Sequence, residues 1–205
     1  LTIGMAAWII ARRYRVPFVY DVQDIWPESA VLSGLLSEGW MTRLMSRTER
    51  FVYRRAARVL VVTDGARENL MRKGVASAKV TVAPNWVDER VFIDVDVSGQ
   101  ERVRAECGWG RDFVLMFAGN LGLVQGLEVV LHAAKSLRDP RGLRIVFLGD
   151  GADRDRLVRI AGELHLDDVV EFRPRVAADQ VPGFLAAADA LLVHLRRSPL
   201  SRLIV

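Results

Sequence analysis

Hydrophobic and polar positions follow a regular order along the chain, in which short apolar runs are separated by longer amphipathic stretches. The clearest amphipathic stretch is 127–137, where Leu127, Val130, Leu131, Ala134 and Leu137 recur at helical spacing on one face. The apolar runs are continuous, which is typical of strands buried on both faces of a parallel sheet. They lie at 18–20, 58–63, 79–82, 113–117, 143–148, 169–172 and 190–193. The pattern therefore predicts a doubly wound α/β fold.

The order of strands and helices breaks once, between Asn85 and Asp112. Pro84-Asn85-Trp86 is a turn signal, and the stretch 94–99 is polar and typical of a loop. Strand and helix patterns then resume. We therefore predict two Rossmann-like domains that meet near residue 95, the first spanning 1–95 and the second 96–205.

Composition and charge narrow the class of protein. The chain has 205 residues, of which 51% are hydrophobic and 26% charged, a balance typical of globular rather than disordered proteins. Its net charge of +4 suits an acidic small molecule or an anionic membrane surface, and we expect no nucleic-acid partner. The single Cys107 excludes an internal disulfide framework and fits a reducing cytoplasm.

Both ends of the sequence look cut. The first residue is Leu1 rather than Met, and the last residues, Leu203-Ile204-Val205, are apolar. The stretch 1–11 is too weakly patterned for a signal peptide, and we interpret it as the body of a helix. We expect the chain to be a piece of a longer protein.

A glycine-rich segment lies between the apolar run 113–117 and the amphipathic stretch 127–137. It contains Gly119, Gly122 and Gly126. A helix N-terminus binds phosphate through free N–H groups, and glycines let the backbone approach a ligand or adopt positive φ. The segment has neither the Gly-Lys-Ser/Thr of a P-loop nor the Gly-x-Gly-x-x-Gly of dinucleotide-binding folds. From these residues alone, phosphate binding and a simple tight turn are both open.

Several segments together resemble glycosyltransferase family 4, and within it the branch that builds O-antigen, capsule and colanic-acid-type polysaccharides. The matching stretches keep the family's order and spacing over nearly the whole chain. They are Tyr20-Asp21-Val22-Gln23-Asp24-Ile25-Trp26-Pro27-Glu28-Ser29, Glu49-Arg50 with 57–63, Pro84-Asn85-Trp86-Val87-Asp88, Gly119-Asn120 with Gln125-Gly126, and Leu148-Gly149-Asp150-Gly151. The resemblance implies a GT-B fold of two Rossmann-like domains, both incomplete in this chain, with the acceptor side first and the donor side second.

The implied activity is retaining transfer of a sugar, of hexosyl or N-acetylhexosaminyl type, from a nucleoside diphosphate to a saccharide or polyprenyl-linked acceptor. The resemblance places the donor diphosphate at Gly119, Asn120, Gly122, Gln125 and Gly126. It places the nucleobase and ribose at Gly149, Asp150, Arg173 and Pro174, and it implies that His194 and the loop 196–199 face the donor. Gln23, with Asp24 beside it, takes the position of a polar residue near the reacting sugar. A plain strand-end turn at 23–24 and a solvent loop at 173–175 are the alternatives.

This sequence departs from the family pattern in two ways. Many members carry Arg and Lys where Asn120 and Gln125 stand, so diphosphate binding here must depend more on backbone N–H groups. The family's acidic motif (Glu, seven residues, Glu) and its N-terminal acceptor loop fall outside 1–205. We therefore expect this piece alone to be inactive.

No metal or cofactor is expected. The three histidines are scattered, and no pair of aspartates spaced by one residue follows a predicted strand. The nucleotide sugar is the donor substrate, and we expect metal-independent chemistry.

A helix predicted over residues 41–54 presents two faces. Arg43, Arg47, Arg50 and Arg54 share one face, and an apolar side is expected from Met41, Leu44, Met45, Thr48 and Val52. The arginine face is either simply solvated or in peripheral contact with an anionic membrane. The expected location is the cytoplasm, with the inner face of the cell membrane as the site of such contact.

Two other functions stay open. One is a GT-B-fold sugar-nucleotide epimerase, which would need acid and base side chains in the cleft. The other is a noncatalytic nucleotide-sugar binding module. A dinucleotide oxidoreductase fits less well because its glycine fingerprint is absent.

Overall fold

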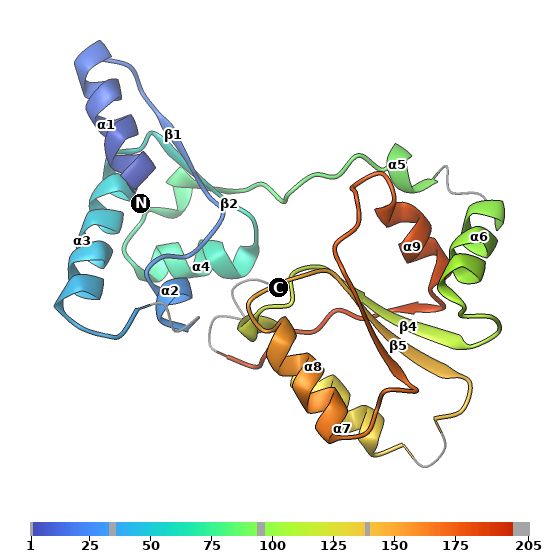
Figure 1. Cartoon of the computed structure of the whole chain (residues 1–205). Coiled ribbons are helices and arrows are strands. Elements are labelled where there is room, and N and C mark those ends of the chain that lie inside the picture. The colour runs from blue at the N-terminus through green and yellow to red at the C-terminus, as the bar shows by residue number, and fades with distance from the viewer. Residues whose placement is uncertain (1, 33–35, 94–96, 138–139, 199–205) are drawn as a thin grey trace. The chain divides into compact units, whose positions relative to one another are not determined.

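The computed structural model describes residues 2–32, 36–93, 97–137 and 140–198. The described chain forms two compact units (Figure 1). One contains the residues up to Trp86 together with Arg197 and Ser198, and the other contains Val87–Arg196. The division after Trp86 is earlier than the boundary we predict near residue 95. The expected loop over 94–99 differs too: 94–96 lie outside the described residues, and 97–99 begin helix α6 (Val97–Cys107), whose polar surface resembles a loop in sequence.

The first unit contains a three-stranded parallel sheet with the order β1-β2-β3. Tyr20 of β1 pairs with Val59 of β2, and Leu60 of β2 pairs with Thr81 of β3. All three strands therefore end at the same edge of the sheet. The elements are α1 (Thr2–Tyr14), β1 (Val19–Val22), α2 (Glu28–Leu32), α3 (Trp40–Arg55), β2 (Arg58–Val61), α4 (Asp64–Arg72), η1 (Ser77–Lys79) and β3 (Val80–Val82).

The core of the first unit joins the sheet to α3 and α4. Tyr53 of α3, Leu70 of α4 and Val59 of β2 are all essentially inaccessible to solvent. Helix α1 packs against α3, and a Cβ on Gly4 would approach Val52 at 2.8 Å. The absence of a side chain at Gly4 therefore allows this close contact.

The second unit contains a four-stranded parallel sheet with the order β6-β5-β4-β7. Phe117 of β4 pairs with Phe147 of β5, which pairs with Phe172 of β6. The elements are α5 (Arg90–Ile93), α6 (Val97–Cys107), β4 (Phe113–Ala118), η2 (Leu123–Gln125), α7 (Glu128–Lys135), β5 (Leu143–Leu148), α8 (Arg154–Glu163), β6 (Val170–Arg173), α9 (Val181–Ala187) and β7 (Ala190–Leu191).

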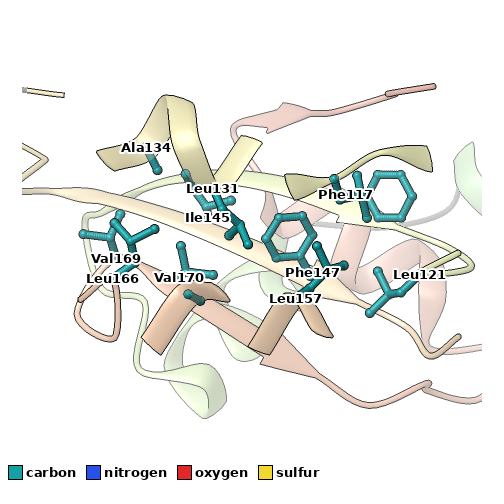
Figure 2. Packing of buried hydrophobic residues seen from close by; sticks show 12 residues of the cluster. Phe117, Leu121, Leu131, Ala134, Ile145, Phe147, Leu157, Leu166, Val169 and Val170 are labelled. Atoms are coloured by element: carbon teal, nitrogen blue, oxygen red, sulfur yellow. The ribbon is translucent and has the colours of Figure 1, made fainter. Parts of the chain in front are cut away.

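Both faces of the four-stranded sheet are covered by helices. On one face, Phe147 packs with Leu131 of α7 and Leu157 of α8, as Figure 2 shows. On the other face, Met116 packs with Val103 of α6. Alternate residues of β4 and β5 thus enter two separate cores, which explains why these strands are apolar except at Arg144. The prediction of a doubly wound α/β fold with parallel sheets is confirmed.

Three details differ from the sequence pattern. Helix α7 ends at Lys135, so Leu137 lies beyond it and is 47% exposed rather than buried. Strand β7 ends at Leu191, and Val193, expected in a strand, is 89% exposed. On α3, Met41 and Leu44 are about half exposed, while the buried positions are Thr42, Glu49, Val52 and Tyr53. Hydrophobic periodicity fails on α3 because two polar residues are buried with hydrogen-bond partners.

Among the helices that the structure describes, none has the length and apolar character needed to cross a membrane.

Candidate functional site

In the second unit, the loops that follow β4, β5 and β6 lie next to one another at the carboxyl ends of the strands. Gly119 N donates to the carbonyl of Leu148 at 2.9 Å, and Gly149 N donates to the carbonyl of Arg173 at 3.1 Å. These bonds continue the sheet ladder by one residue beyond each strand. Open parallel sheets bind ligands at this edge.

Gly149 brings the first two loops into close backbone contact. Its φ is +142°, and a Cβ there would overlap the carbonyl oxygen of Gly119. Leu121 N then donates to the carbonyl of Asp150 at 2.8 Å, and Asp153 N donates to the carbonyl of Leu121 at 2.9 Å. The loops after β4 and β5 are therefore one rigid backbone feature.

A cavity of about 530 Å³ opens beside these two loops. Gly119 and Asn120 line it from the loop after β4, and Gly149 and Asp150 line it from the loop after β5. Its other walls come from the strand ends, the segment after β6 and α9. They are Ala118, Leu148, Arg175, Val176, Ala178, Val181 and Leu185. A cavity with this mixture of backbone, apolar and few charged groups can hold a flat aromatic ring with hydrogen-bonding edges, such as a nucleobase.

The rest of the glycine-rich segment, 122–126, does not line this cavity. Gly122 has φ −106°, so its backbone conformation does not itself require glycine. A Cβ on Gly122 would instead lie 2.9 Å from Asn120 Nδ2 and 2.8 Å from Gln125 Oε1. Gly126, by contrast, is left-handed at φ +61°. The side-chain amides of Asn120 and Gln125 thus occupy the space next to Gly122.

Hydrogen-bond donors remain available in this segment. The N–H groups of Gly119 and Gly149 are used within the fold, so their contribution to a site is conformational. The N–H groups of Asn120 and Gly122 have no partner among the residues that the structure describes. Gln125 Oε1, which can only accept a hydrogen bond, is buried without one. The segment can therefore offer backbone N–H groups to an anion.

A charged cluster fixes the segment after β7 against the glycine-rich segment. His194 Nδ1 lies 2.5 Å from the carbonyl of Gln125, and Arg196 N donates to the carbonyl of Val124 at 2.8 Å. The Arg196 side chain pairs with Glu128 at 2.5 Å. Pro199, the last residue of the expected loop, lies outside the described residues.

Glu128 is also the partner of a second arginine. Arg156 Nη2 lies 3.1 Å from Glu128 and Nε lies 2.5 Å from the buried Asp153. Partial burial raises the pKa of Glu128, but its own backbone N–H together with Arg156 and Arg196 outweighs burial, and the net pKa is lowered. The 52%-exposed side chain of Arg196 therefore already has an anionic partner within the fold.

Arg173 and Arg175 point to different places, although they are two residues apart. The Arg173 side chain lies 5.5 Å over the Trp109 ring and 2.5 Å from Glu171, away from the cavity. Arg175 lines the cavity, while Pro174 is exposed and does not. The sequence predicted Arg173 and Pro174 rather than Arg175 at this position, and it gave no signal for Val176, Ala178, Val181 and Leu185.

Gln23 and Asp24 lie in the first unit, directly after β1. Both are exposed, and Gln23 Nε2 donates to Asp21 Oδ2 at 2.8 Å. They stand at the carboxyl end of a parallel strand, as expected, and they belong to a different unit from the other site residues. Their catalytic role stays a prediction.

In the part of the chain that the structure describes, no group of three or more His, Cys, Asp or Glu side chains is placed to hold a metal ion.

Comparisons with known proteins match both parts of the chain. The model of the Glycosyl transferase 4-like domain matches residues 1–86, and the model of Glycosyl transferases group 1 matches residues 100–201. The chain is 27% identical over 183 residues to the putative colanic acid biosynthesis glycosyl transferase WcaI of Escherichia coli K12, covering 87% of this chain and 44% of that protein. It is 30% identical over 204 residues to the D-inositol 3-phosphate glycosyltransferase of Kineococcus radiotolerans, covering 93% and 46%. The chain thus spans about half the length of the curated relatives it matches.

Among solved structures, Anabaena Alr3699/HepE in complex with UDP and glucose is similar, with a TM-score of 0.76 at 20% identity. The match covers 92% of this chain and 49% of that one. At this identity the likeness shows a shared fold.

Proposed function

Because this chain belongs to glycosyltransferase family 4 and has its GT-B fold, we propose that the full-length protein is a retaining glycosyltransferase. It moves a sugar from a nucleoside diphosphate to a lipid-linked saccharide in bacterial cell-surface polysaccharide synthesis. The observation that carries the proposal is the cavity formed by Gly119, Asn120, Gly149 and Asp150 at the carboxyl edge of the second sheet. The UDP bound by HepE and the colanic-acid role in the name of WcaI support the choice of donor and pathway.

The two parts of the glycine-rich segment bind different parts of the donor. The cavity takes the nucleobase and ribose against Asp150 and Arg175. The diphosphate lies at Asn120, Gly122 and Gln125, where N–H groups and amides replace the cations of other family members. Donors fixed in advance stabilise the charge of the leaving diphosphate as the bond to the sugar breaks. Gln23 and Asp24 act on the sugar side of that bond.

A transfer assay with the full-length protein tests the proposal. The expected product from UDP-glucose and a polyprenyl-diphosphate-linked saccharide is a lipid-linked saccharide longer by one sugar, with the donor's anomeric configuration. Epimerised UDP-sugar without transfer would indicate the epimerase instead. Exclusive use of D-inositol 3-phosphate as acceptor would contradict the lipid-linked acceptor.

We expect Gly122→Val to weaken UDP binding about tenfold or more while the second unit stays folded. Valine accepts the extended backbone at this position, so the added carbons displace the flexible amides of Asn120 and Gln125 rather than the backbone. Each lost hydrogen bond accounts for roughly 0.5–1.5 kcal/mol, so Gln125→Ala alone should reduce affinity about threefold to tenfold. Calorimetric titration of UDP measures both.

The matched control for this pair is Leu123→Ala, which changes a 46%-exposed side chain in the same segment and should bind UDP like the wild type. A circular-dichroism melt confirms the fold of each variant. Wild-type UDP affinity in Gly122→Val would show that the segment is a plain turn.

Arg175→Ala should weaken UDP binding about threefold to tenfold, because it removes a hydrogen-bonding group from the cavity wall. Arg173→Ala should leave UDP affinity unchanged and lower the melting temperature, because its side chain contacts Trp109 and Glu171 instead. The two variants are compared by UDP titration and thermal melts. If Arg173→Ala weakened UDP binding and Arg175→Ala did not, the nucleobase would lie next to Arg173 instead.

We also propose that α3 contacts the inner face of the cell membrane from the cytoplasm. Its exposed arginines lie beside Trp40, Met41 and Leu44, which are 73%, 47% and 53% exposed. Exposed apolar side chains next to cations suit the interface of an anionic bilayer.

Arg43→Ala with Arg47→Ala should weaken binding to phosphatidylserine vesicles about thirtyfold, because each basic residue near such a surface contributes roughly 1 kcal/mol. Vesicle co-sedimentation measures this, and the difference should disappear at high salt. The control is Arg12→Ala with Arg13→Ala, an exposed pair on α1 that removes the same charge. Equal losses in both double variants would contradict a role for α3.

A further inference from the structure

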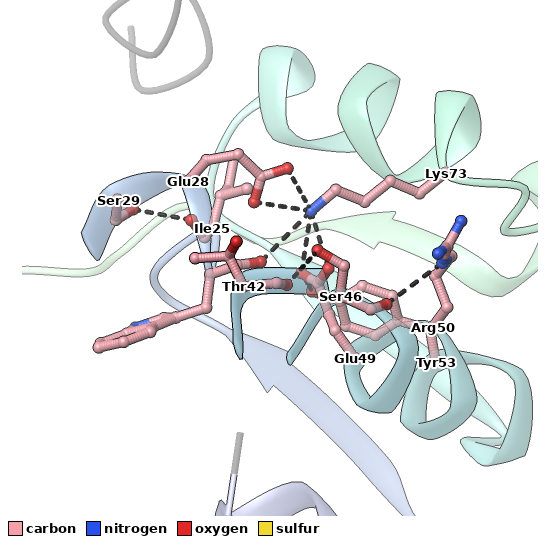
Figure 3. A network of polar contacts seen from close by, with 10 residues as sticks. Ile25, Glu28, Ser29, Thr42, Ser46, Glu49, Arg50, Tyr53 and Lys73 are labelled. Atoms are coloured by element: carbon pink, nitrogen blue, oxygen red, sulfur yellow. Dashed lines mark hydrogen bonds and ion pairs between the residues drawn. The ribbon is translucent and has the colours of Figure 1, made fainter. Parts of the chain in front are cut away.

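Lys73, at the C-terminal cap of α4, is the centre of a largely buried polar network in the first unit (Figure 3). Its Nζ lies 3.0 and 2.9 Å from the two carboxylate oxygens of Glu49 and 2.9 Å from Glu28. It also donates to the carbonyl of Trp26 at 3.3 Å. The Lys73 side chain is 15% exposed and that of Glu49 is 3% exposed. One ammonium group therefore joins α2, α3, α4 and the segment after β1.

The partners of Lys73 are themselves fixed. Tyr53 Oη donates to Glu49 Oε1 at 2.6 Å from one turn along α3. Burial raises the pKa of Glu49, and the bonds from Tyr53 and Lys73 offset this only in part. A buried ion pair costs desolvation free energy, and well-packed apolar residues often stabilise a core as well or better. Stability alone therefore does not explain why the chain has a buried cation here.

The segment 23–27 has few other polar links to the fold. Its remaining hydrogen bonds are local: Gln23 bonds to Asp21, Trp26 N bonds to the carbonyl of Asp24, and the carbonyls of Ile25 and Pro27 accept from the start of α2. Within the described residues, the bond from Lys73 to the Trp26 carbonyl is the only hydrogen bond from this segment to an element beyond α2.

We propose that Lys73 is a positioning residue that holds the segment carrying Gln23 and Asp24 in place for sugar transfer. Glu49, held by Tyr53, fixes the ammonium, and the ammonium fixes the Trp26 carbonyl two residues after Asp24. The inference rests on the proposed function for its catalytic consequence. The fixing of the segment can be measured without it.

The experiment compares Lys73→Met with the double variant Lys73→Met/Glu49→Gln in the full-length protein. The single variant leaves a buried carboxylate unpaired. The double variant removes both charges and keeps an acceptor for Tyr53, so its melting temperature should return close to that of the wild type. The bond to the Trp26 carbonyl is absent in both. Thermal melts, amide hydrogen exchange, UDP titration and UDP-glucose turnover are measured for each.

In the double variant, we expect amides 24–30 to exchange about tenfold to a hundredfold faster, because a hydrogen bond to a charged group is lost. We expect kcat to fall by about the same factor, because small misplacements of catalytic groups are costly. KM and UDP affinity should not change. The matched control is Lys79→Met, which removes another lysine that donates to a carbonyl, that of Arg54 at 2.8 Å, and should alter neither exchange nor kcat.

Two results would overturn the inference, and they are distinguishable. Wild-type exchange of amides 24–30 in the double variant would show that Lys73 does not hold the segment. Faster exchange with unchanged kcat would show that the segment is held but that Gln23 and Asp24 take no part in transfer, which contradicts the proposed function at these residues.

Discussion

Gly149→Ala should destabilise the second unit by about 2–6 kcal/mol and abolish UDP binding. At φ +142° an alanine is strained by roughly 1–3 kcal/mol, and its Cβ would overlap the carbonyl oxygen of Gly119, which adds roughly 1–3 kcal/mol of overpacking. The atom in the way is backbone, so no side-chain rotation relieves the overlap. The loops after β4 and β5 must separate, and the cavity that they line is distorted.

Urea unfolding and UDP titration measure both effects. The matched control is Gly162→Ala, where a Cβ would meet no atom within 4 Å in helix α8, so the variant should be as stable as the wild type or slightly more stable. Near wild-type stability of Gly149→Ala would mean that the two loops are not in close contact, and the assignment of the cavity would be wrong.

The second large effect is expected in the first unit. Lys73→Met should lower the free energy of unfolding of the first unit by about 3–5 kcal/mol at neutral pH, because the buried Glu49 loses its cation. Glu28 should contribute little to this loss, since its side chain is 37% exposed and can be solvated.

The loss should depend on pH in a defined direction. The pKa of Glu49 is raised by burial, so folding is favoured most when this carboxyl is protonated. That contribution is fully present below the pKa of an unfolded glutamate and is lost as pH rises through the higher folded-state pKa. Removing Lys73 removes a charge that lowers this pKa, so the pKa rises further.

The loss of unfolding free energy in Lys73→Met, relative to the wild type, should therefore be largest at pH 8. Part of this loss should disappear as the pH is lowered toward 5. Denaturant unfolding across this range measures the trend, and Lys73→Met/Glu49→Gln should not show it. If the loss of unfolding free energy instead grew as the pH fell, the raised pKa of Glu49 would not be its cause.

Hydrophobic pattern predicted β4 and β5 well because both strands are buried on both faces of the sheet. The runs 113–117 and 143–148 correspond to β4 and β5 almost residue for residue. The same reasoning failed on α3, because Thr42 and Glu49 are buried as hydrogen-bonded polar groups. It failed at Leu137 because helix α7 ends sooner than its apolar spacing continues.

The candidate site was predictable in part. Order and spacing of motifs indicated the glycine-rich segment, and Gly119 and Asn120 do line the cavity. Sequence could not separate Arg173 from Arg175, because their side chains leave the end of β6 in different directions and only the neighbours of each decide its role. It also gave no sign of the network at Lys73, whose partners come from residues 26, 28 and 49.

By itself, the sequence determined the doubly wound fold and the family, because both can be predicted from local patterns. These patterns are continuous apolar strands, helical periodicity and motifs at fixed spacing. The tertiary structure decided which groups meet. The overlap that Gly149 avoids involves Gly119, and the amides above Gly122 come from Asn120 and Gln125. The ammonium that fixes Trp26 comes from another helix. Contacts of this kind depend on how distant segments are brought together, so short-range spacing along the chain does not predict them.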